Sequence, residues 1–109
     1  VNISPLEIDD VLKRHHGVKF AMAIPFEHRY YGEEIAAYII PHNPAAPPTE
    51  AELLAHCRTH LPFAKQPKLV LFGAEVPYTA TGKPKRLEVT ARLAPTLAQY
   101  HDRQFREQT

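Results

Sequence analysis

Residues 18–24 read Val-Lys-Phe-Ala-Met-Ala-Ile, and residues 35–40 read Ile-Ala-Ala-Tyr-Ile-Ile. In the first stretch, large apolar side chains alternate with lysine and alanine, which is the period of a strand that Pro25 ends. The second stretch is an apolar run, long enough for a strand and short for a helix. A polar turn at 27–32 separates them, so we expect the two strands to pair antiparallel. The small alanines on one face of the first strand indicate that a helix packs closely there.

Helices are predicted before and after this pair. Residues 4–7 (Ser-Pro-Leu-Glu) have the pattern of a capping box with proline at the first helical position. We expect that helix to fray at residues 15–17 (His-His-Gly), where a protonated imidazole would suit the helix dipole. Residues 49–52 (Thr-Glu-Ala-Glu) contain a second capping box, which starts a helix that runs through about His60 and is halted by Pro62.

The last third of the chain adds a strand and a helical pattern. Residues 68–72 predict a third strand, and the pattern is helical again from Leu87 until it is broken near Pro95. The tail beyond about residue 93 is expected to be an extra, solvated helix. Together these elements predict the α+β fold class: a small two-layer domain with a three-stranded, mainly antiparallel sheet backed by helices.

Composition limits the classes of protein that the chain can belong to. With 109 residues, 44% of them hydrophobic, it is one small domain that buries a modest core but not a large substrate cavity as well. A net charge of +1 with dispersed basic residues gives no reason to propose nucleic-acid binding. The single cysteine, Cys57, excludes an internal disulfide, and no apolar stretch approaches the ~20 residues of a membrane span. We expect a soluble, cytoplasmic domain, and the missing initiator methionine predicts that Val1 is a cut inside a longer protein.

A lysine stands at the predicted tip of a loop. Residues 77–86 read Pro-Tyr-Thr-Ala-Thr-Gly-Lys-Pro-Lys-Arg. Pro77 and Pro84 fix φ and lack an N–H, which excludes an inner strand or a helix interior, and Gly82 allows a tight turn. The ammonium group of Lys83 is a compact charge on a flexible stem, suited to a carboxylate or phosphate oxygen. Lys83 is therefore the candidate functional residue, and a solvated turn with a basic surface is the alternative.

The sequence argues against a zinc site and against a phosphate-binding P-loop. His56 and His60 stand four residues apart with Glu52 on the same face, a spacing that can hold zinc. Cys57 points about 100° away from His56 in an α-helix, so at most three ligands converge and we predict no metal site. A phosphate-binding P-loop is excluded because proline, instead of serine or threonine, follows Lys83.

Two motifs resemble a known family. The string Pro-x-Thr-x-Thr-Gly-Lys-x-x-Arg at 77–86 resembles the C-terminal signature of adenylate-forming enzymes, which include acyl-CoA synthetases, firefly luciferase and peptide-synthetase adenylation domains. Residues 1–9 resemble the segment that follows the family's hinge, and 32–33 (Gly-Glu) and 65–67 (Lys-Gln-Pro) fall where family landmarks are expected. Two motifs in this order, roughly 75 residues apart, are more specific than either alone. The resemblance runs from the first residue to about Leu93.

The resemblance implies a division of labour between two domains. Residues 1–109 would be the mobile C-terminal domain of an AMP-forming acyl-CoA synthetase, inactive as an isolated fragment. A large N-terminal domain would bind most of the ATP, Mg²⁺ and CoA and the carboxylic acid substrate. In the first of two working poses, Lys83 would bridge the acid's carboxylate and the nucleotide while the acyl-adenylate forms. Thr81 and Gly82 would support the loop.

The resemblance also implies a second pose and a form of regulation. After rotation of the domain, Asn2, Ile3 and Ser4 would line the tunnel for the pantetheine arm of CoA. Arg58 is a candidate contact to the CoA phosphates, with a solvated arginine as the alternative. The loop further resembles sequences that bacterial lysine acetyltransferases modify, and acetylation of Lys83 would delete its charge.

Three functions of different classes stay open. The first is the C-terminal domain of an acyl-CoA synthetase, the second is that of a peptide-synthetase adenylation domain acting with a carrier protein, and the third is a binding module without catalysis. Residues 81–83 (Thr-Gly-Lys) and 2–5 (Asn-Ile-Ser-Pro) are similar to the synthetase style, whereas peptide synthetases tend to have Asn-Gly-Lys at this loop. Luciferase-like oxidation also remains open.

Overall fold

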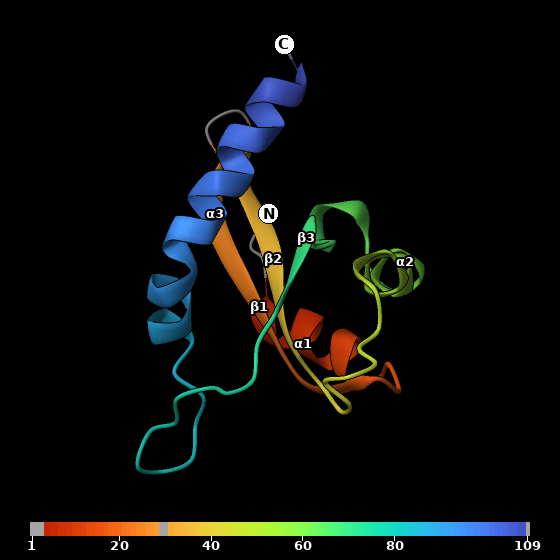
Figure 1. The fold of residues 1–109 in the computed structure, drawn as a ribbon, viewed down its shortest axis with the longest axis vertical. Helices are drawn as coiled ribbons and strands as arrows, with labels where there is room; N and C mark the ends of the chain where they lie inside the picture. The colour runs from red at the N-terminus through yellow and green to blue at the C-terminus, as the bar shows by residue number, and fades with distance from the viewer. Residues whose placement is uncertain (1–3, 29–30, 109) are drawn as a thin grey trace.

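The computed structural model describes residues 4–28 and 31–108. Its elements are, in chain order, α1 (Pro5–Lys13), β1 (Val18–His28), β2 (Gly32–Pro41), α2 (Glu50–His60), the 3-10 turn η1 (Phe63–Lys65), β3 (Leu69–Phe72) and α3 (Arg86–Gln108) (Figure 1). Within the described residues, no helix has the length and apolar character needed to cross a membrane.

The three strands form one sheet in the order β1-β2-β3. The ladder between β1 and β2 is antiparallel and runs from Val18 opposite Pro41 to His28 opposite Gly32. The ladder between β2 and β3 is parallel and much shorter, because β3 has only four residues. The predicted α+β class with a mainly antiparallel sheet is confirmed.

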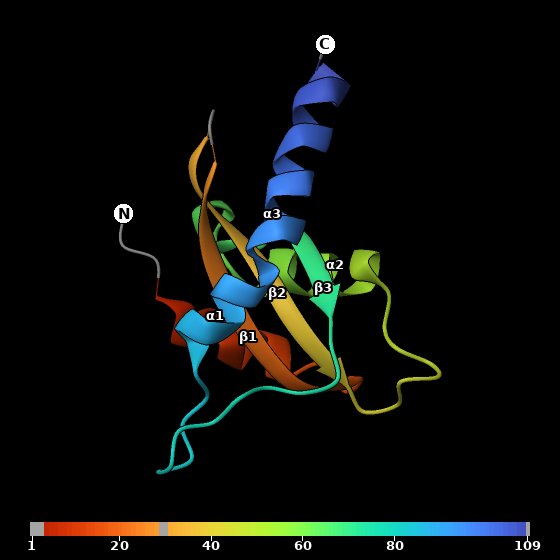
Figure 2. The ribbon, with the colours of Figure 1, turned by 60° about the vertical axis from the view of Figure 1, so that its left-hand side comes forward.

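Helices cover both faces of this sheet (Figures 1 and 2). On one face, Ala21 and Ala23 of β1 belong to a buried cluster with apolar side chains of α1 and α2. The predicted close approach of a helix over these alanines is therefore confirmed. On the other face, Met22 belongs to a second cluster with Val89 and Leu97 of α3. The fold has this third layer in addition to the two that the sequence predicts.

Pro25 does not end β1, contrary to the prediction from the sequence. The strand continues to His28, with Pro25 opposite Ile35. β1 is an edge strand, and Ala23 directs its N–H and its carbonyl away from β2, toward Asp9 and α3. Residues two apart in a strand point the same way, so the missing N–H of Pro25 also lies on the free edge, where it removes no ladder hydrogen bond.

Pro95 does not break α3 either. The helix runs through it, and the pyrrolidine ring lies on the exposed side. Proline leaves the carbonyl of Ala91 without its helical partner, and because Ala91 and Pro95 are exposed, this group is not buried away from solvent. Burial of Val89 and Leu97 on either side of the proline holds the helix against the sheet. Tertiary packing thus outweighs the local signal.

The two predicted capping boxes have different outcomes. Thr49 caps α2 as expected, because its Oγ1 accepts a hydrogen bond from the N–H of Glu52 at 3.0 Å. The box at the start of α1 is wrong, since Ser4 makes no side-chain cap hydrogen bond. Glu7, its expected partner, instead accepts a hydrogen bond from Lys65 Nζ at 2.7 Å. Proline at the first helical position is left as the local start signal of α1.

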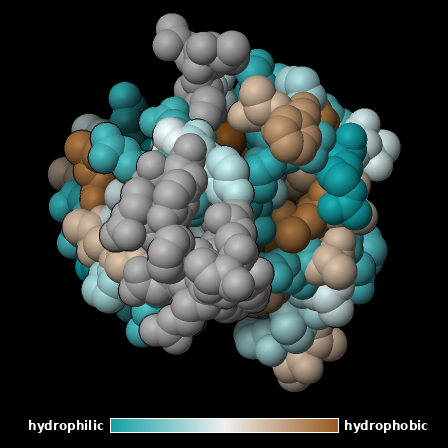
Figure 3. Space-filling view, turned by 90° about the horizontal axis from the view of Figure 1, so that it is seen from above, coloured by the Kyte–Doolittle hydropathy of each residue, from teal (hydrophilic) through white to brown (hydrophobic). Residues whose placement is uncertain are grey.

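On the face seen from above, apolar side chains are visible at several separate places outside the area that is drawn in grey (Figure 3). Brown apolar groups lie there in separate patches between teal polar ones. Among the exposed apolar side chains, Phe63 on η1 is 77% exposed, and Lys68 Nζ lies 4.1 Å from the centre of its ring. The ammonium group therefore covers part of an aromatic face that would otherwise meet only water.

Gly73 lets the chain pass close to Tyr38 as it leaves β3. The Tyr38 hydroxyl donates a hydrogen bond to the carbonyl of Glu75 at 2.6 Å, and the N–H of Gly73 donates to the carbonyl of Ile39 at 2.9 Å. A Cβ atom at Gly73 would lie 2.0 Å from the Tyr38 hydroxyl oxygen. These contacts fix where the chain departs from the sheet toward residues 77–86, which carry Lys83 and which we call the lysine loop.

We expect Gly73→Ala to lower the free energy of unfolding by about 1–3 kcal/mol, because the added methyl group must displace a packed tyrosine. Urea unfolding of the wild type and the variant measures the difference. Ala74→Ser, a change at the exposed neighbouring residue, is the control and should stay within about 0.5 kcal/mol. Equal stability of all three proteins would contradict the packing argument.

Candidate functional site

The segment between β3 and α3 folds back on itself as a narrow loop. Tyr78 and Pro84 form an isolated antiparallel bridge, and the N–H of Lys85 donates a hydrogen bond to the carbonyl of Pro77 at 2.9 Å. These two pairings close the base of the loop. Residues 79–83 are thereby presented as its tip, away from the sheet and helices (Figures 1 and 2).

Thr79 holds the tip from inside. Its N–H donates to the carbonyl of Lys83 at 2.8 Å, and its Oγ1 accepts a hydrogen bond from the N–H of Lys83 at 3.0 Å. Gly82 makes the turn at φ 85° and donates to the carbonyl of Thr79 at 3.0 Å. Thr81, which was expected to support the loop, has its hydroxyl 3.1 Å from that of Thr79. Thr79 is thus a supporting residue that the sequence reasoning missed, although it lies within the recognised string.

The side chain of Lys83 is exposed. In the part of the chain that the structure describes, no carboxylate lies within ion-pairing distance of its ammonium group. Its backbone, by contrast, is bound on both polar groups by Thr79. The loop therefore combines a fixed main chain with a cation that is available to an anion outside this domain.

A buried polar cluster lies where the loop re-enters the domain. We call it the Asp9–Arg86–Ala23 cluster, after the residues of α1, α3 and β1 that form it. Arg86 donates to Asp9 through Nη2 to Oδ2 at 2.7 Å and through Nη1 to Oδ1 at 3.3 Å, and its Nη1 also donates to the Ala23 carbonyl at 2.6 Å. The N–H of Ala23 donates to Asp9 Oδ1 at 2.6 Å. Asp9 is only 5% exposed, and the Arg86 side chain is 25% exposed.

Of the residues predicted to bind CoA, Ser4 and Arg58 lie on other elements than this loop. Asn2 and Ile3 fall outside the described residues. Ser4 is exposed at the start of α1, and Arg58 is exposed on α2, across the sheet from α3. The structure therefore brings Lys83, Gly82 and Thr81 together and leaves Ser4 and Arg58 on other elements.

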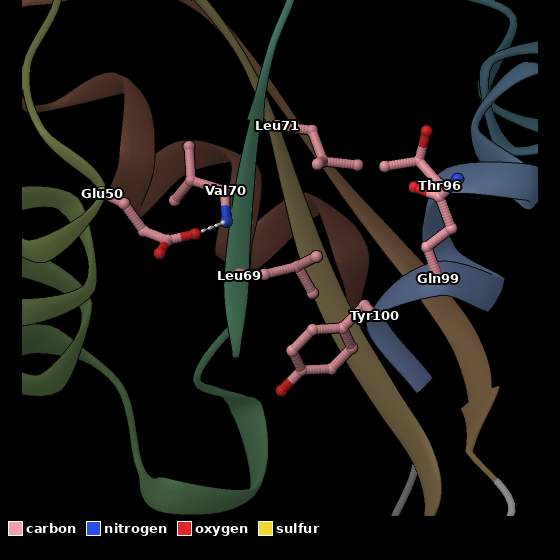
Figure 4. A pocket seen from close by; sticks show the side chains of 7 residues that line it. All are labelled: Glu50, Leu69, Val70, Leu71, Thr96, Gln99 and Tyr100. Carbon is pink, nitrogen blue, oxygen red and sulfur yellow. Dashed lines mark hydrogen bonds between the residues drawn. The ribbon is translucent and has the colours of Figure 1, made fainter. Parts of the chain in front are cut away.

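A hollow of about 420 Å³ lies beside β3 and is open to solvent (Figure 4). It is lined by Glu50, Leu69, Val70, Leu71, Thr96, Gln99 and Tyr100. Glu50 Oε2 accepts a hydrogen bond from the N–H of Val70 at 2.8 Å, so α2 satisfies a backbone group on the outer edge of the sheet. No predicted site residue lines this hollow, and we assign it no function.

His56 and His60, for which no metal site was predicted, lie within hydrogen-bond distance of backbone carbonyls. His56 Nε2 lies 2.7 Å from the carbonyl of Val11, and His60 Nδ1 lies 2.8 Å from the carbonyl of His56. His15 Nδ1 accepts a hydrogen bond from the N–H of Gly17 at 3.1 Å. Within the described residues, no three histidine, cysteine or carboxylate side chains are grouped so that they would hold a metal ion.

The surroundings of His15 lower the pKa of its imidazole. Burial lowers its pKa below 6.5, and the neighbouring His16 and His56 lower the pKa further. Glu52, whose Oε2 lies 3.8 Å from His15 Nε2, acts in the opposite direction but does not outweigh them. A protonated imidazole at the end of α1, as expected from the helix dipole, is therefore disfavoured at His15.

Comparison with known proteins finds relatives that match most of this chain. A family model described as "AMP-binding enzyme C-terminal domain" matches residues 7–83. The chain is 43% identical over 88 residues to the sulfoacetate–CoA ligase of Cupriavidus necator, a match that covers 81% of this chain and 17% of the relative. It is 35% identical over 88 residues to the long-chain-fatty-acid–CoA ligase of Salmonella typhimurium, covering 81% and 15%.

A solved structure of a CoA synthetase also has a similar fold over most of this chain. The fatty acyl CoA synthetase of Mycobacterium tuberculosis superposes with a TM-score of 0.78 and 27% sequence identity. The superposition covers 88% of this chain and 19% of that protein. The chain thus spans less than a fifth of the length of the relatives named here.

The lowered pKa of His15 predicts how the free energy of unfolding changes with pH. Because its folded pKa is below the unfolded value of 6.5, the unfolded chain takes up the proton more readily. Stability should therefore fall as the pH drops below about 6.5 and level off below the folded pKa. In His15→Asn, whose amide oxygen can still accept from Gly17, this fall should be smaller. Urea unfolding at pH 7.5, 6.5, 5.5 and 4.5 tests this, and identical slopes in both proteins would contradict it.

Proposed function

The chain belongs to the family of AMP-binding enzyme C-terminal domains, and from this membership we propose that it is the mobile C-terminal domain of an ATP-dependent, AMP-forming acid–CoA ligase. The observation that carries the proposal is the loop that is hydrogen-bonded to itself and presents the exposed side chain of Lys83. An N-terminal domain supplies the pockets for ATP, Mg²⁺, CoA and the acid. This domain, alone, is inactive.

Lys83 acts in the first half-reaction, in which the acid's carboxylate attacks the α-phosphorus of ATP. A new oxygen–phosphorus bond forms, the bond to the β-phosphate oxygen breaks, and pyrophosphate leaves. Two anions must approach each other for this to happen. A cation that contacts both the carboxylate and the nucleotide lowers that barrier, as lysine and arginine clamps do in other phosphoryl transfers.

The hydrogen bonds inside the loop favour this role. A lysine on a free loop would lose backbone freedom when it docked, and that loss would oppose the reaction. Thr79 already fixes the main chain of Lys83, and Gly82 adopts its turn conformation without strain. Only the lysine side chain remains to be ordered when the two domains meet.

The second half-reaction uses a different face of the domain. After rotation, the CoA thiolate attacks the carbonyl of the acyl-adenylate and AMP leaves. Residues 2–4 line the pantetheine tunnel in this pose, and Arg58 contacts the CoA phosphates as an exposed cation. Lys83 is then remote from the reacting atoms.

Replacing Lys83 separates the two half-reactions. In the full-length natural protein that contains this chain, Lys83→Ala should slow adenylation by about 100-fold or more, equivalent to about 3 kcal/mol, because one positioned charge is lost. Formation of acyl-CoA from supplied acyl-adenylate should be unchanged. Pyrophosphate release measures the first step, and acyl-CoA formation measures the second.

Lys85→Ala is the matched control for this experiment. Lys85 lies two residues away on the same loop, its side chain is 47% exposed, and its Nζ is 3.9 Å from Glu88. Both half-reactions should keep wild-type rates in this variant. Equal loss of both half-reactions in Lys83→Ala would count against the proposed function.

We also propose that acetylation of Lys83 regulates the enzyme. The exposed side chain is accessible to a lysine acetyltransferase, and an acetyl group removes the charge that adenylation needs. Treatment of the full-length protein with a bacterial lysine acetyltransferase and acetyl-CoA should modify Lys83 and stop pyrophosphate release, while the second half-reaction continues. Mass spectrometry that finds Lys83 unmodified after treatment would remove this proposal.

A further inference from the structure

The hydrogen bonds at the tip and at the base of the lysine loop join the loop to itself. Thr79 binds Lys83, and Lys85 binds Pro77, so these bonds fix the shape of the loop but not its direction relative to the sheet. That direction depends on the two places where the loop joins the domain. The first follows Gly73, and the second is Arg86, the first residue of α3.

Arg86 is held much more firmly than a surface arginine. Its planar guanidinium group reaches both oxygens of Asp9 and the carbonyl of Ala23, and Asp9 is held in turn by the N–H of Ala23. A bidentate contact of this kind fixes the orientation of the arginine as well as its distance. The first turn of α3 is thereby locked to α1 and to the outer edge of β1.

The connection from this lock to the lysine is short and stiff. Pro84 and Lys85 are the residues between Lys83 and Arg86. Pro84 has a fixed φ and pairs with Tyr78, and the N–H of Lys85 is bound. A shift of the Arg86 backbone therefore moves Lys83 with it.

Stability alone is a weak explanation for burying this pair. Desolvation of two charges offsets most of their attraction, so apolar side chains of similar volume often stabilise a protein equally well. Apolar burial, however, is not directional, so it does not fix the orientation of the first turn of α3 as a bidentate pair does. A lysine that must reach two anions in another domain needs a direction, because an error of about 1 Å can cost about 100-fold in rate.

We propose that Asp9 and Arg86 are positioning residues for Lys83 in the adenylation half-reaction, a role that rests on the proposed function. They touch neither substrate nor nucleotide. They act by setting where the loop leaves the domain.

The test uses the full-length natural protein and both half-reactions, at a temperature well below the Tm of each variant. Arg86→Ala should lower kcat for adenylation by about 100-fold, with KM for acid and ATP changed little and the thioester step unchanged. Arg86→Lys keeps one charge but not the planar fork, so it should recover part of the lost rate. Asp9→Asn should give the same split from the other side of the pair, and the double variant should cost little more than either single variant.

Arg92→Ala is the matched control. Arg92 lies on the same helix, its side chain is 55% exposed, and it donates to Glu88 at 3.1 Å. Its removal should leave both half-reactions at wild-type rates.

Two results would overturn the inference. Wild-type adenylation in Arg86→Ala would exclude a positioning role, and loss of both half-reactions in proportion to the unfolded fraction would reduce the pair to a structural one. Lys83→Ala, measured alongside, separates this from failure of the proposed function. If Lys83→Ala abolishes adenylation while Arg86→Ala does not, only the inference fails, and if Lys83→Ala leaves adenylation intact, both fail.

Discussion

Ala23 is the residue on whose backbone groups the arrangement of this domain depends. It lies on the outer edge of β1, where neither its N–H nor its carbonyl has a partner in the sheet. Unpaired groups on an edge strand are a liability in a buried setting. Asp9 from α1 and Arg86 from α3 satisfy both groups, so the backbone of one residue joins helices from the two faces of the sheet.

Packing and polarity cooperate at this place. The small side chains of Ala21 and Ala23 let α1 approach the sheet, and that approach brings the Asp9 carboxylate to the edge of β1. The burial that makes Asp9 only 5% exposed would be costly for a lone carboxylate. Three donated hydrogen bonds, one from Ala23 and two from Arg86, compensate for it. The core and the base of the lysine loop are thus parts of one structure.

Local sequence signals were sufficient where the determining contacts are local. The alternation at 18–24, the Thr49 cap and the glycine turn before Lys83 each involve residues a few positions apart, and the structure has them. The capping box at α1 and the predicted break at Pro95 failed because contacts with distant parts of the chain decided the structure there. Glu7 is bound by Lys65, 58 residues away, and the proline in α3 is tolerated because neighbouring residues pack on the sheet.

The same reason explains which part of the site was missed. Lys83 and Gly82 were found because a short string carries them, but Asp9 and Arg86 stand 77 residues apart. One signal was present: Asp9 is a carboxylate among Ile8, Val11 and Leu12, which form the buried face of α1. An acidic side chain in such a stripe needs a partner, because a buried charge is rarely left alone. The sequence does not say which of its thirteen basic residues that partner is.

The backbone polarity of Ala23 decides which charged side chain lies beside its N–H and which beside its carbonyl. Its N–H requires an acceptor, which a carboxylate supplies and a guanidinium does not, and its carbonyl requires a donor, for which the reverse holds. The acid must therefore come from the element nearer the N–H and the arginine from the element nearer the carbonyl. An exchanged pair would keep its mutual attraction, but it would set the guanidinium donor against the N–H donor and the carboxylate acceptor against the carbonyl acceptor. The backbone of an edge strand thus specifies which of the two charges meets its N–H and which meets its carbonyl.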